Sequence, residues 1–331
     1  MDYPYYTGQQ DRQLQSPALI EEVAVFRDVD PKAYLPDEGL VDAVNVALVL
    51  GQPLLLTGEP GTGKTQLAYN LAAELGFGKP LKFETKSSSV ARDLFYTYDT
   101  LRRFHAAHND GSKRALDYLT YSALGTAIIL SMTPDERQPL MTPDLVEAGP
   151  ARRSVVVIDE IDKAPRDFPN DVLNEIEHLY FRIPEAENIE ARASKALRPI
   201  VVVTSNSEKH LPDAFLRRCV FYNIEFPKPD RLKKILLLRL AADRDVVLGD
   251  DFLTDAIDLF GRLRMGETGL RKKPGTAELL GWVSALARAG AQTQKALGGQ
   301  KQLVRASLGA LIKNSEDQDT ARSVVEAWSG R

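Results

Sequence analysis

The 331-residue chain has little cysteine and histidine: one Cys, Cys219, and four His. One cysteine excludes an internal disulfide, and so few Cys and His residues exclude a zinc ribbon. Disulfide-free proteins are typical of reducing compartments, so we expect a cytoplasmic location. The first residues also lack the basic-then-apolar pattern of a signal peptide, which agrees with that expectation.

Long apolar runs and long basic runs are also missing. The longest apolar stretches, residues 44–56 and 123–132, fall short of the roughly 20 residues that a membrane-spanning helix needs. The 42 Lys and Arg residues against 46 Asp and Glu residues give a net charge of −4. Because nucleic-acid binding depends on cationic surface, we do not expect a nucleic-acid partner.

The apolar pattern divides the chain into parts. Unbroken apolar runs at 54–56, 154–158 and 200–204 are typical of central strands in a parallel sheet, and helical patterns lie at 37–50, 66–75 and 168–180. This alternation predicts an α/β fold. Residues 181–198, before the last of these strands, fit a hairpin.

A rigid Phe-Pro-Lys-Pro-Asp segment at 226–230 ends this pattern, and only helical patterns follow it. They lie at 231–242, 251–264, 276–288, 303–312 and 320–328. We therefore expect three parts: an N-terminal extension (1–34), an α/β core (35–228) and a smaller all-α domain (229–331).

The strongest motif is the sequence Thr-Gly-Glu-Pro-Gly-Thr-Gly-Lys-Thr after the first strand, which matches G-x-x-x-x-G-K-[ST] between a strand and a helix. Its glycines permit the tight turn that brings backbone N–H groups close to phosphate oxygens. Lys64 then supplies a cation to the β and γ phosphates, and the Thr65 hydroxyl can bind Mg²⁺. The expected ATP-contacting residues are Gly58, Glu59, Pro60, Gly61, Thr62, Gly63, Lys64, Thr65 and Gln66. The alternative, a chance glycine-rich turn, would match the four fixed positions in roughly one chain per hundred of this length.

An acidic pair follows the second apolar strand. Carboxylates at the carboxyl end of a parallel strand lie where α/β sheets bind ligands. We expect Asp159 to hold Mg²⁺ and Glu160 to act as the base for an attacking water. A solvated acidic loop is the alternative, and the phosphate loop favours the catalytic interpretation.

Four segments in this order, GEPGTGKT, VVVIDEID, VVVTSN and LPDAFLRRC, resemble those of AAA+ ATPases, and the pattern is most similar to the MoxR-like family. The resemblance covers about residues 35–227 well and the helical part less well. It implies a P-loop NTPase core of AAA+ type followed by a helical lid. It also implies a homo-oligomer, expected to be a hexameric ring, that hydrolyses ATP with Mg²⁺ at the interfaces between subunits.

The same resemblance assigns roles to further residues. Asn206 matches the sensor that orients the attacking water, although it can equally be a turn residue that ends a strand. Arg218 matches the arginine finger, with Arg217 in its place if the register differs by one. Without the phosphate loop, the two arginines would be interpreted as surface residues of a helix.

The helical part departs from the family pattern, because no arginine stands at the usual start of a lid helix. Either Arg271 or Lys273 substitutes for it, or this basic run is a solvated helix cap. The adenine contact is equally open: Tyr34 can stack on the base or pack on the core. Cys219 is expected to be a small packed residue rather than a reactive thiol.

These observations leave two main functions. The first is a chaperone or remodeller of a partner protein, driven by ATP hydrolysis; the resemblance makes a partner with a von Willebrand A domain plausible. The second is a nucleotide-gated oligomeric interaction or signalling module, in which ATP binding recruits an effector and hydrolysis only resets it. A DNA motor is disfavoured by the charge, and a GTPase by the lack of an N-K-x-D motif.

Overall fold

The computed structural model of the chain describes residues 30–108, 114–145, 149–207, 211–240, 247–265 and 269–330. Residues 1–29, most of the expected N-terminal extension, lie outside this description. The chain forms two compact units. Among the described residues, one unit consists of those in 36–59 and 63–225; the other contains those in 226–330 together with 30–35 and 60–62.

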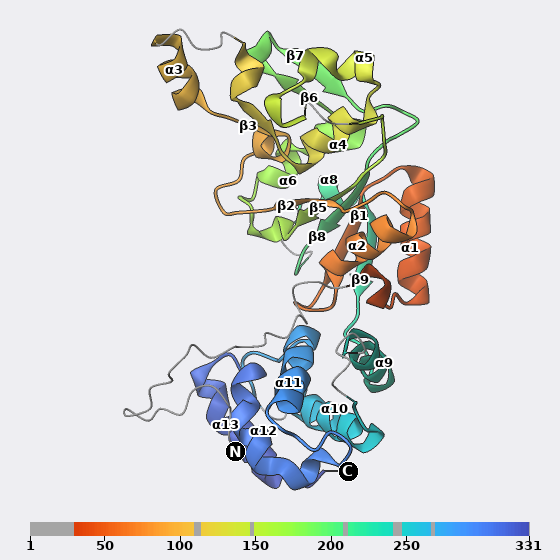
Figure 1. Cartoon of the computed structure of the whole chain (residues 1–331), viewed down its shortest axis with the longest axis vertical. Helices are drawn as coiled ribbons and strands as arrows, with labels where there is room; N and C mark the ends of the chain where they lie inside the picture. Colours follow the sequence, from red (N-terminus) through yellow and green to blue (C-terminus); the bar gives the residue numbers. More distant parts are fainter. Residues whose placement is uncertain are drawn as a thin grey trace, which may run out of the picture. The chain divides into compact units, whose positions relative to one another are not determined.

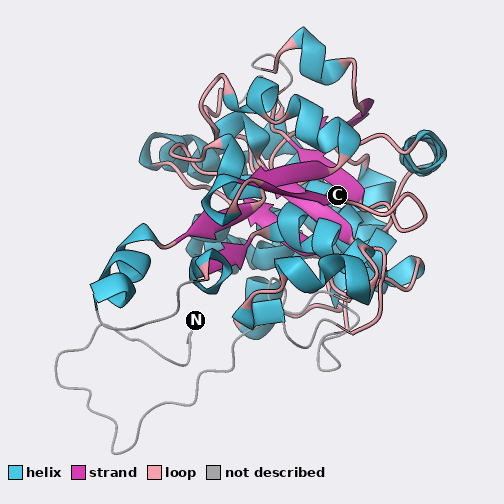
Figure 2. Cartoon of the chain, turned by 90° about the horizontal axis from the view of Figure 1, so that it is seen from above, coloured by secondary structure: helices cyan, strands magenta, loops and turns pink. Residues whose placement is uncertain are grey.

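The first unit is built on a five-stranded sheet in which every pairing is parallel. In spatial order its strands are β2 (Leu81–Glu84), β5 (Val155–Asp159), β8 (Ile200–Thr204), β1 (Leu54–Gly58) and β9 (Val220–Ile224), drawn as arrows in Figures 1 and 2. The three expected strands are the three central ones, and each is almost wholly buried. The α/β fold class is therefore confirmed.

Both edge strands were absent from the sequence prediction. Residues in β2 alternate between half-buried and exposed, and β9 does so over most of its length. An edge strand covered on one face needs no continuous apolar run, so neither strand has the pattern that identifies a buried strand.

Helices α1 (Glu38–Leu50) and α2 (Lys64–Glu74) flank β1 in the sequence. The Asp37 side chain accepts a hydrogen bond of 2.8 Å from the Leu40 N–H and so caps the start of α1. Gly51, with a left-handed φ of 63°, ends the helix. Helix α2 packs against β5, β1 and β8, and α4 (Ala123–Ser131) against β2 and β5. Helix α4 is the apolar run noted in the sequence.

Two antiparallel strand pairs extend this unit. One consists of β3 (Tyr96–Tyr98) and β4 (Leu119–Tyr121), and the other of β6 (Tyr180–Ile183) and β7 (Ile189–Arg192). The second confirms the hairpin expected at 181–198. The short helices of the unit are α3 (Thr100–His108), α5 (Pro134–Arg137), α6 (Phe168–Asp171), α7 (Leu173–His178) and α8 (Asp213–Leu216).

The single helix expected at 168–180 is wrong, because the segment forms α6 and α7 with a break at Val172. Leu179 adopts a left-handed φ of 49°, which ends α7 before the chain enters β6. The apolar period continues through the break because Val172, Ile176 and Leu179 all remain buried. Periodicity alone therefore could not reveal where the helix is interrupted.

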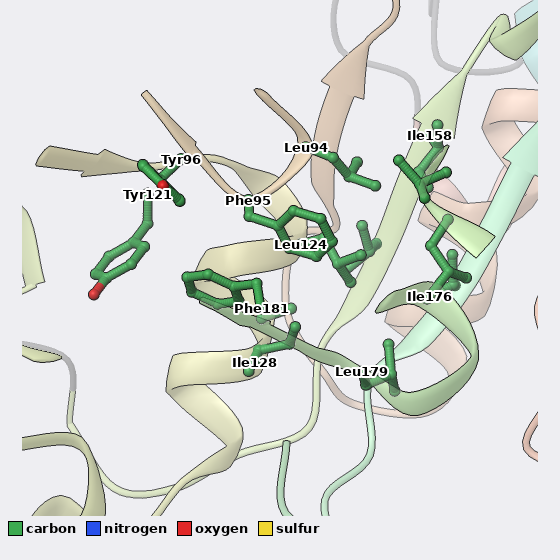
Figure 3. Packing of buried hydrophobic residues seen from close by; sticks show 14 of the residues in the cluster. Leu94, Phe95, Tyr96, Tyr121, Leu124, Ile128, Ile158, Ile176, Leu179 and Phe181 are labelled. Atoms are coloured by element: carbon green, nitrogen blue, oxygen red, sulfur yellow. The ribbon is translucent and has the colours of Figure 1, made fainter. Parts of the chain in front are cut away.

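Aromatic rings join the two strand pairs to the rest of the core (Figure 3). The rings of Phe95 and Phe181 stack with centroids 5.2 Å apart, and Tyr121 meets Phe181 edge-on at 5.9 Å. Leu124 and Ile128 of α4 belong to the same buried cluster. The two strand pairs and the five-stranded sheet thus share one hydrophobic core.

The second unit is helical, as expected. Its α-helices are α9 (Pro229–Leu240), α10 (Asp250–Arg264), α11 (Thr276–Arg288), α12 (Lys301–Ser307) and α13 (Ser315–Ala327). The Trp282 indole is buried among them and donates a hydrogen bond of 2.8 Å to Ser307 Oγ. Across the described part of both units, no helix combines the length and apolar character needed to cross a bilayer.

Gly125 gives a test of the core. A β-carbon there would lie 1.9 Å from the Phe95 carbonyl oxygen, so Gly125→Ala must push α4 away from the Phe95 backbone, which precedes β3. We expect the free energy of unfolding to fall by about 1–3 kcal/mol, measured by urea denaturation. The control is Gly261→Ala in α10, where a β-carbon meets no atom within 4 Å. This control should leave the free energy of unfolding at its wild-type value or raise it by up to about 1 kcal/mol. Equal effects of the two substitutions would contradict the close packing described.

Candidate functional site

The phosphate-loop motif forms the turn between β1 and α2. Gly58, Gly61 and Gly63 have φ values of 141°, 80° and 91°, a region that side-chain-bearing residues rarely adopt. Gly63 directly precedes the first residue of α2, so the motif ends at the N-terminus of an 11-residue helix. Since the first N–H groups of a helix lack intrahelical acceptors, this terminus favours an anion such as phosphate.

Lys64 is the first residue of α2 and is only 7% exposed. Its ammonium group donates hydrogen bonds to the carbonyl oxygens of Gly58 (2.8 Å) and Glu59 (3.0 Å) and to Oδ1 of Asn206 (3.1 Å). Burial lowers the pKa of Lys64, and the neighbouring carboxylates of the site oppose that shift. The expected phosphate-binding cation and the expected water-orienting amide are therefore in direct contact.

Asp159, the last residue of β5, is the centre of a second group of contacts. Its Oδ1 atom accepts hydrogen bonds from the hydroxyls of Thr65 (2.8 Å) and Thr204 (2.7 Å). Burial alone would raise the pKa of Asp159, but the bonds from Thr204, Lys82 and Thr65 hold it below its ordinary value. The carboxylate is thus charged at neutral pH. Mg²⁺ prefers hard oxygen ligands, so Thr65 and Asp159 together fit this ion.

Glu160 has an unusual backbone for a residue with a side chain, with φ 55° and ψ 53°. Its N–H donates a 2.9 Å hydrogen bond to the Thr204 hydroxyl, and its carboxylate forms an ion pair with Lys163. Left-handed backbone at a non-glycine residue costs of order 1–3 kcal/mol and is frequent at functional sites. The strained position supports a functional role for Glu160.

Sequence reasoning missed three supporting residues. The Thr204 hydroxyl links Asp159 to the Glu160 N–H, and Asp162 accepts a 3.2 Å hydrogen bond from the Asn206 N–H. Lys82 of β2 lies 2.9 Å from Asp159 Oδ2. Thr204 and Asp162 belong to the recognised motifs, so a role for them was open to inference. Lys82 carried no signal because β2 itself was not recognised.

The two candidate finger arginines lie apart from this cluster. Arg218 is exposed and pairs with Glu177 at 2.7 Å, and its guanidinium also donates to the Ala214 carbonyl oxygen. Both arginines follow α8 and precede β9, at the end of the sheet where the parallel strands begin. The phosphate loop lies where the same strands end. The structure therefore does not bring Arg217 or Arg218 to the loop of their own chain.

The candidate lid residues and the candidate adenine contact each have a definite place in the structure. The Arg271 side chain pairs with Glu316, and Lys273 is exposed. The N–H groups of Arg271 and Lys272 both donate to Asp317, so this basic run is anchored within the helical unit. Tyr34 follows the short 3-10 helix Pro31–Ala33 and is half-buried.

Cys219 is half-buried against the core, and burial raises the pKa of its thiol to about 12. An unreactive thiol is expected from such an environment.

Comparisons with known proteins identify one family. The sequence profile of the AAA domain (dynein-related subfamily) matches residues 53–219. Solved structures with a similar fold include three variants of RuvB from Thermotoga maritima. A proline-to-glycine variant is 18% identical, with 89% of this chain and 74% of that chain covered and a TM-score of 0.47. An arginine-to-alanine variant is 18% identical (85% and 69% covered, TM-score 0.45), and a lysine-to-arginine variant 19% (84% and 69%, TM-score 0.45). No curated protein matches the chain in sequence.

Thr204 gives a test of the site's internal bonding. Thr204→Val keeps the shape of the buried side chain but removes its hydroxyl. The Glu160 N–H then loses its acceptor, and Asp159 Oδ1 loses one of its two donors. We expect the free energy of unfolding to fall by about 1–3 kcal/mol, measured by chemical denaturation. Thr204→Ser retains the hydroxyl and should lose less. A serine variant as unstable as the valine variant would show that the methyl group, not the hydroxyl, is what matters.

Proposed function

Since the chain belongs to the AAA domain family, dynein-related subfamily, we propose that it hydrolyses Mg²⁺-ATP and uses the energy to remodel a partner protein, as a MoxR-like ATPase. The observation that carries the proposal is the pair of contacts that join the phosphate loop to two neighbouring strand ends. Lys64 contacts Asn206 at 3.1 Å, and Thr65 contacts Asp159 at 2.8 Å. A purely structural glycine turn needs neither contact.

Each residue of this cluster has a distinct task in the proposed reaction. Lys64 and the N-terminus of α2 bind the phosphates and neutralise their charge. Thr65 and Asp159 hold Mg²⁺, which supplies further positive charge to the phosphate oxygens. Asn206 orients the attacking water, since its amide both donates and accepts hydrogen bonds. Glu160 accepts the proton that the water loses.

The position of the arginines supports hydrolysis at an interface between subunits. Strands β1 and β9 are paired in register from Leu54 and Val220 to Gly58 and Ile224. At about 3.3 Å per residue, this ladder separates Arg218 from the phosphate loop of its own chain by roughly 13 Å or more. We assign Arg218, or Arg217 as the neighbouring alternative, to the nucleotide of the next subunit in a homo-oligomeric ring, with six subunits by resemblance.

The proposal extends to the organisation of the protein. Residues 35–228 form the nucleotide-binding core, 229–331 the lid and C-terminal helices, and 1–34 an extension. The partner is a protein, and a von Willebrand A-type partner fits the MoxR-like assignment. The net charge of −4 does not favour nucleic acid. The single cysteine agrees with a cytoplasmic location.

One observation favours the second candidate, a nucleotide-gated interaction module. Two of the groups assigned to catalysis, Glu160 and Arg218, form ion pairs within their own chain, with Lys163 and Glu177 respectively. If these ion pairs persist when ATP is bound, turnover is slow and binding alone controls assembly. Steady-state hydrolysis measured together with sedimentation distinguishes the two functions. Assembly on ATP with negligible turnover by the wild-type protein would favour the module.

Glu160→Gln should leave Mg²⁺-ATP binding intact and reduce hydrolysis by about 10²–10⁴-fold, because glutamine cannot accept the proton. Nucleotide binding and phosphate release measure the two effects separately. Glu187→Gln is a matched control, since Glu187 has the same φ of 55° but lies in the connection between β6 and β7. Hydrolysis that survives in the Glu160 variant would remove Glu160 from the mechanism.

Mixing two inactive variants tests the shared interface. Arg218→Ala should reduce hydrolysis by about 10³-fold or more, because finger residues contribute 10³–10⁵ in rate. In a mixture with Glu160→Gln, roughly a quarter of the interfaces combine an intact site with an intact arginine. Phosphate release should therefore recover to that fraction of the wild-type rate. No recovery, while the mixed variants still assemble, would argue against action between subunits.

A further inference from the structure

Strand β2 brings an additional cation to the proposed magnesium site. In the parallel pairing of β2 with β5, Glu84 lies opposite Asp159, so two carboxylates stand at neighbouring strand ends. Lys82 precedes Glu84 by two residues and therefore lies on the same face of the strand. Neither Lys82 nor Glu84 belongs to the phosphate loop or to the acidic pair that follows β5.

The Lys82 ammonium group bridges these two carboxylates. It lies 2.9 Å from Oδ2 of Asp159 and 2.9 Å from Oε1 of Glu84. The other Asp159 oxygen already accepts bonds from Thr65 and Thr204. Both Asp159 oxygens therefore have a partner, and Lys82 is the charged donor among these contacts.

The two ends of this bridge differ in exposure. The Asp159 side chain is 12% exposed, so its charge needs a cation close by. The Glu84 side chain is 70% exposed and is well solvated without a partner. The Lys82 side chain is 30% exposed, so it can keep its bond to Glu84 when it loses the bond to Asp159. The ammonium group thus has a second acceptor within reach.

We propose that Lys82 is a positioning residue that neutralises Asp159 in the absence of Mg²⁺ and pairs with Glu84 alone when Mg²⁺ is bound. This inference rests on the proposed nucleotide site. Two cations beside one carboxylate repel each other, so Lys82 competes with Mg²⁺ for Asp159. Lys82 therefore sets how much Mg²⁺ the site requires, and Glu84 reduces that requirement by accepting the displaced ammonium.

The test measures the affinity for a fluorescent ATP analogue as a function of Mg²⁺ concentration, which needs no hydrolysis. Lys82→Met removes the competitor and should lower the half-effective Mg²⁺ concentration by about three- to tenfold. Glu84→Gln removes the second acceptor and should raise it by about two- to fivefold. The double variant should behave like Lys82→Met, because Glu84 acts only through Lys82.

Lys79→Met is the matched control, since Lys79 is exposed just before β2 and its loss changes net charge equally. Affinity for the analogue in EDTA shows whether each variant keeps an intact loop. An unchanged or higher Mg²⁺ requirement in Lys82→Met overturns the inference, as does a lower requirement in Glu84→Gln. Wild-type protein that binds no ATP analogue at any Mg²⁺ concentration would instead refute the proposed function itself.

Discussion

The negative charge of Asp159 is the constraint on which the site depends. A carboxylate at the end of a central strand is largely withdrawn from water and must find its hydrogen bonds within the protein. Thr65 comes from α2, Thr204 from β8 and Lys82 from β2. One buried charge thus fixes the phosphate-loop helix, the neighbouring strand and the edge strand relative to one another.

The sequence was informative about the fold wherever burial was complete. The central strands β1, β5 and β8 could be predicted because both of their faces are covered, and helices such as α1, α10 and α11 because one face is apolar. Strands β2 and β9 could not, since their half-exposed residues alternate without a long apolar run. The break at Val172 was equally hidden, because it leaves the apolar spacing unchanged.

The candidate site, too, could be predicted from the sequence only in part. Asp159 and Asn206 were predictable as parts of one site because each stands at or just after the carboxyl end of a strand, and parallel strands end together. Lys64 was predictable there because the phosphate loop joins the end of β1 to its helix. The bridge from Lys82 depends on which residue of β2 stands opposite Asp159. That register is set by packing between segments about 75 residues apart, and no local pattern encodes it. The pairing of Arg218 with Glu177 is non-local for the same reason.

The left-handed backbone of Glu160 has a consequence for how this sequence can vary. Glycine adopts φ 55° without steric conflict, so it would suit this backbone better than glutamate does. Glycine would also remove the carboxylate that we assign as the base. At this position, selection for thermal robustness and selection for turnover therefore favour different amino acids. A library screened only for folding should drift toward glycine here and accumulate well-folded, inactive proteins.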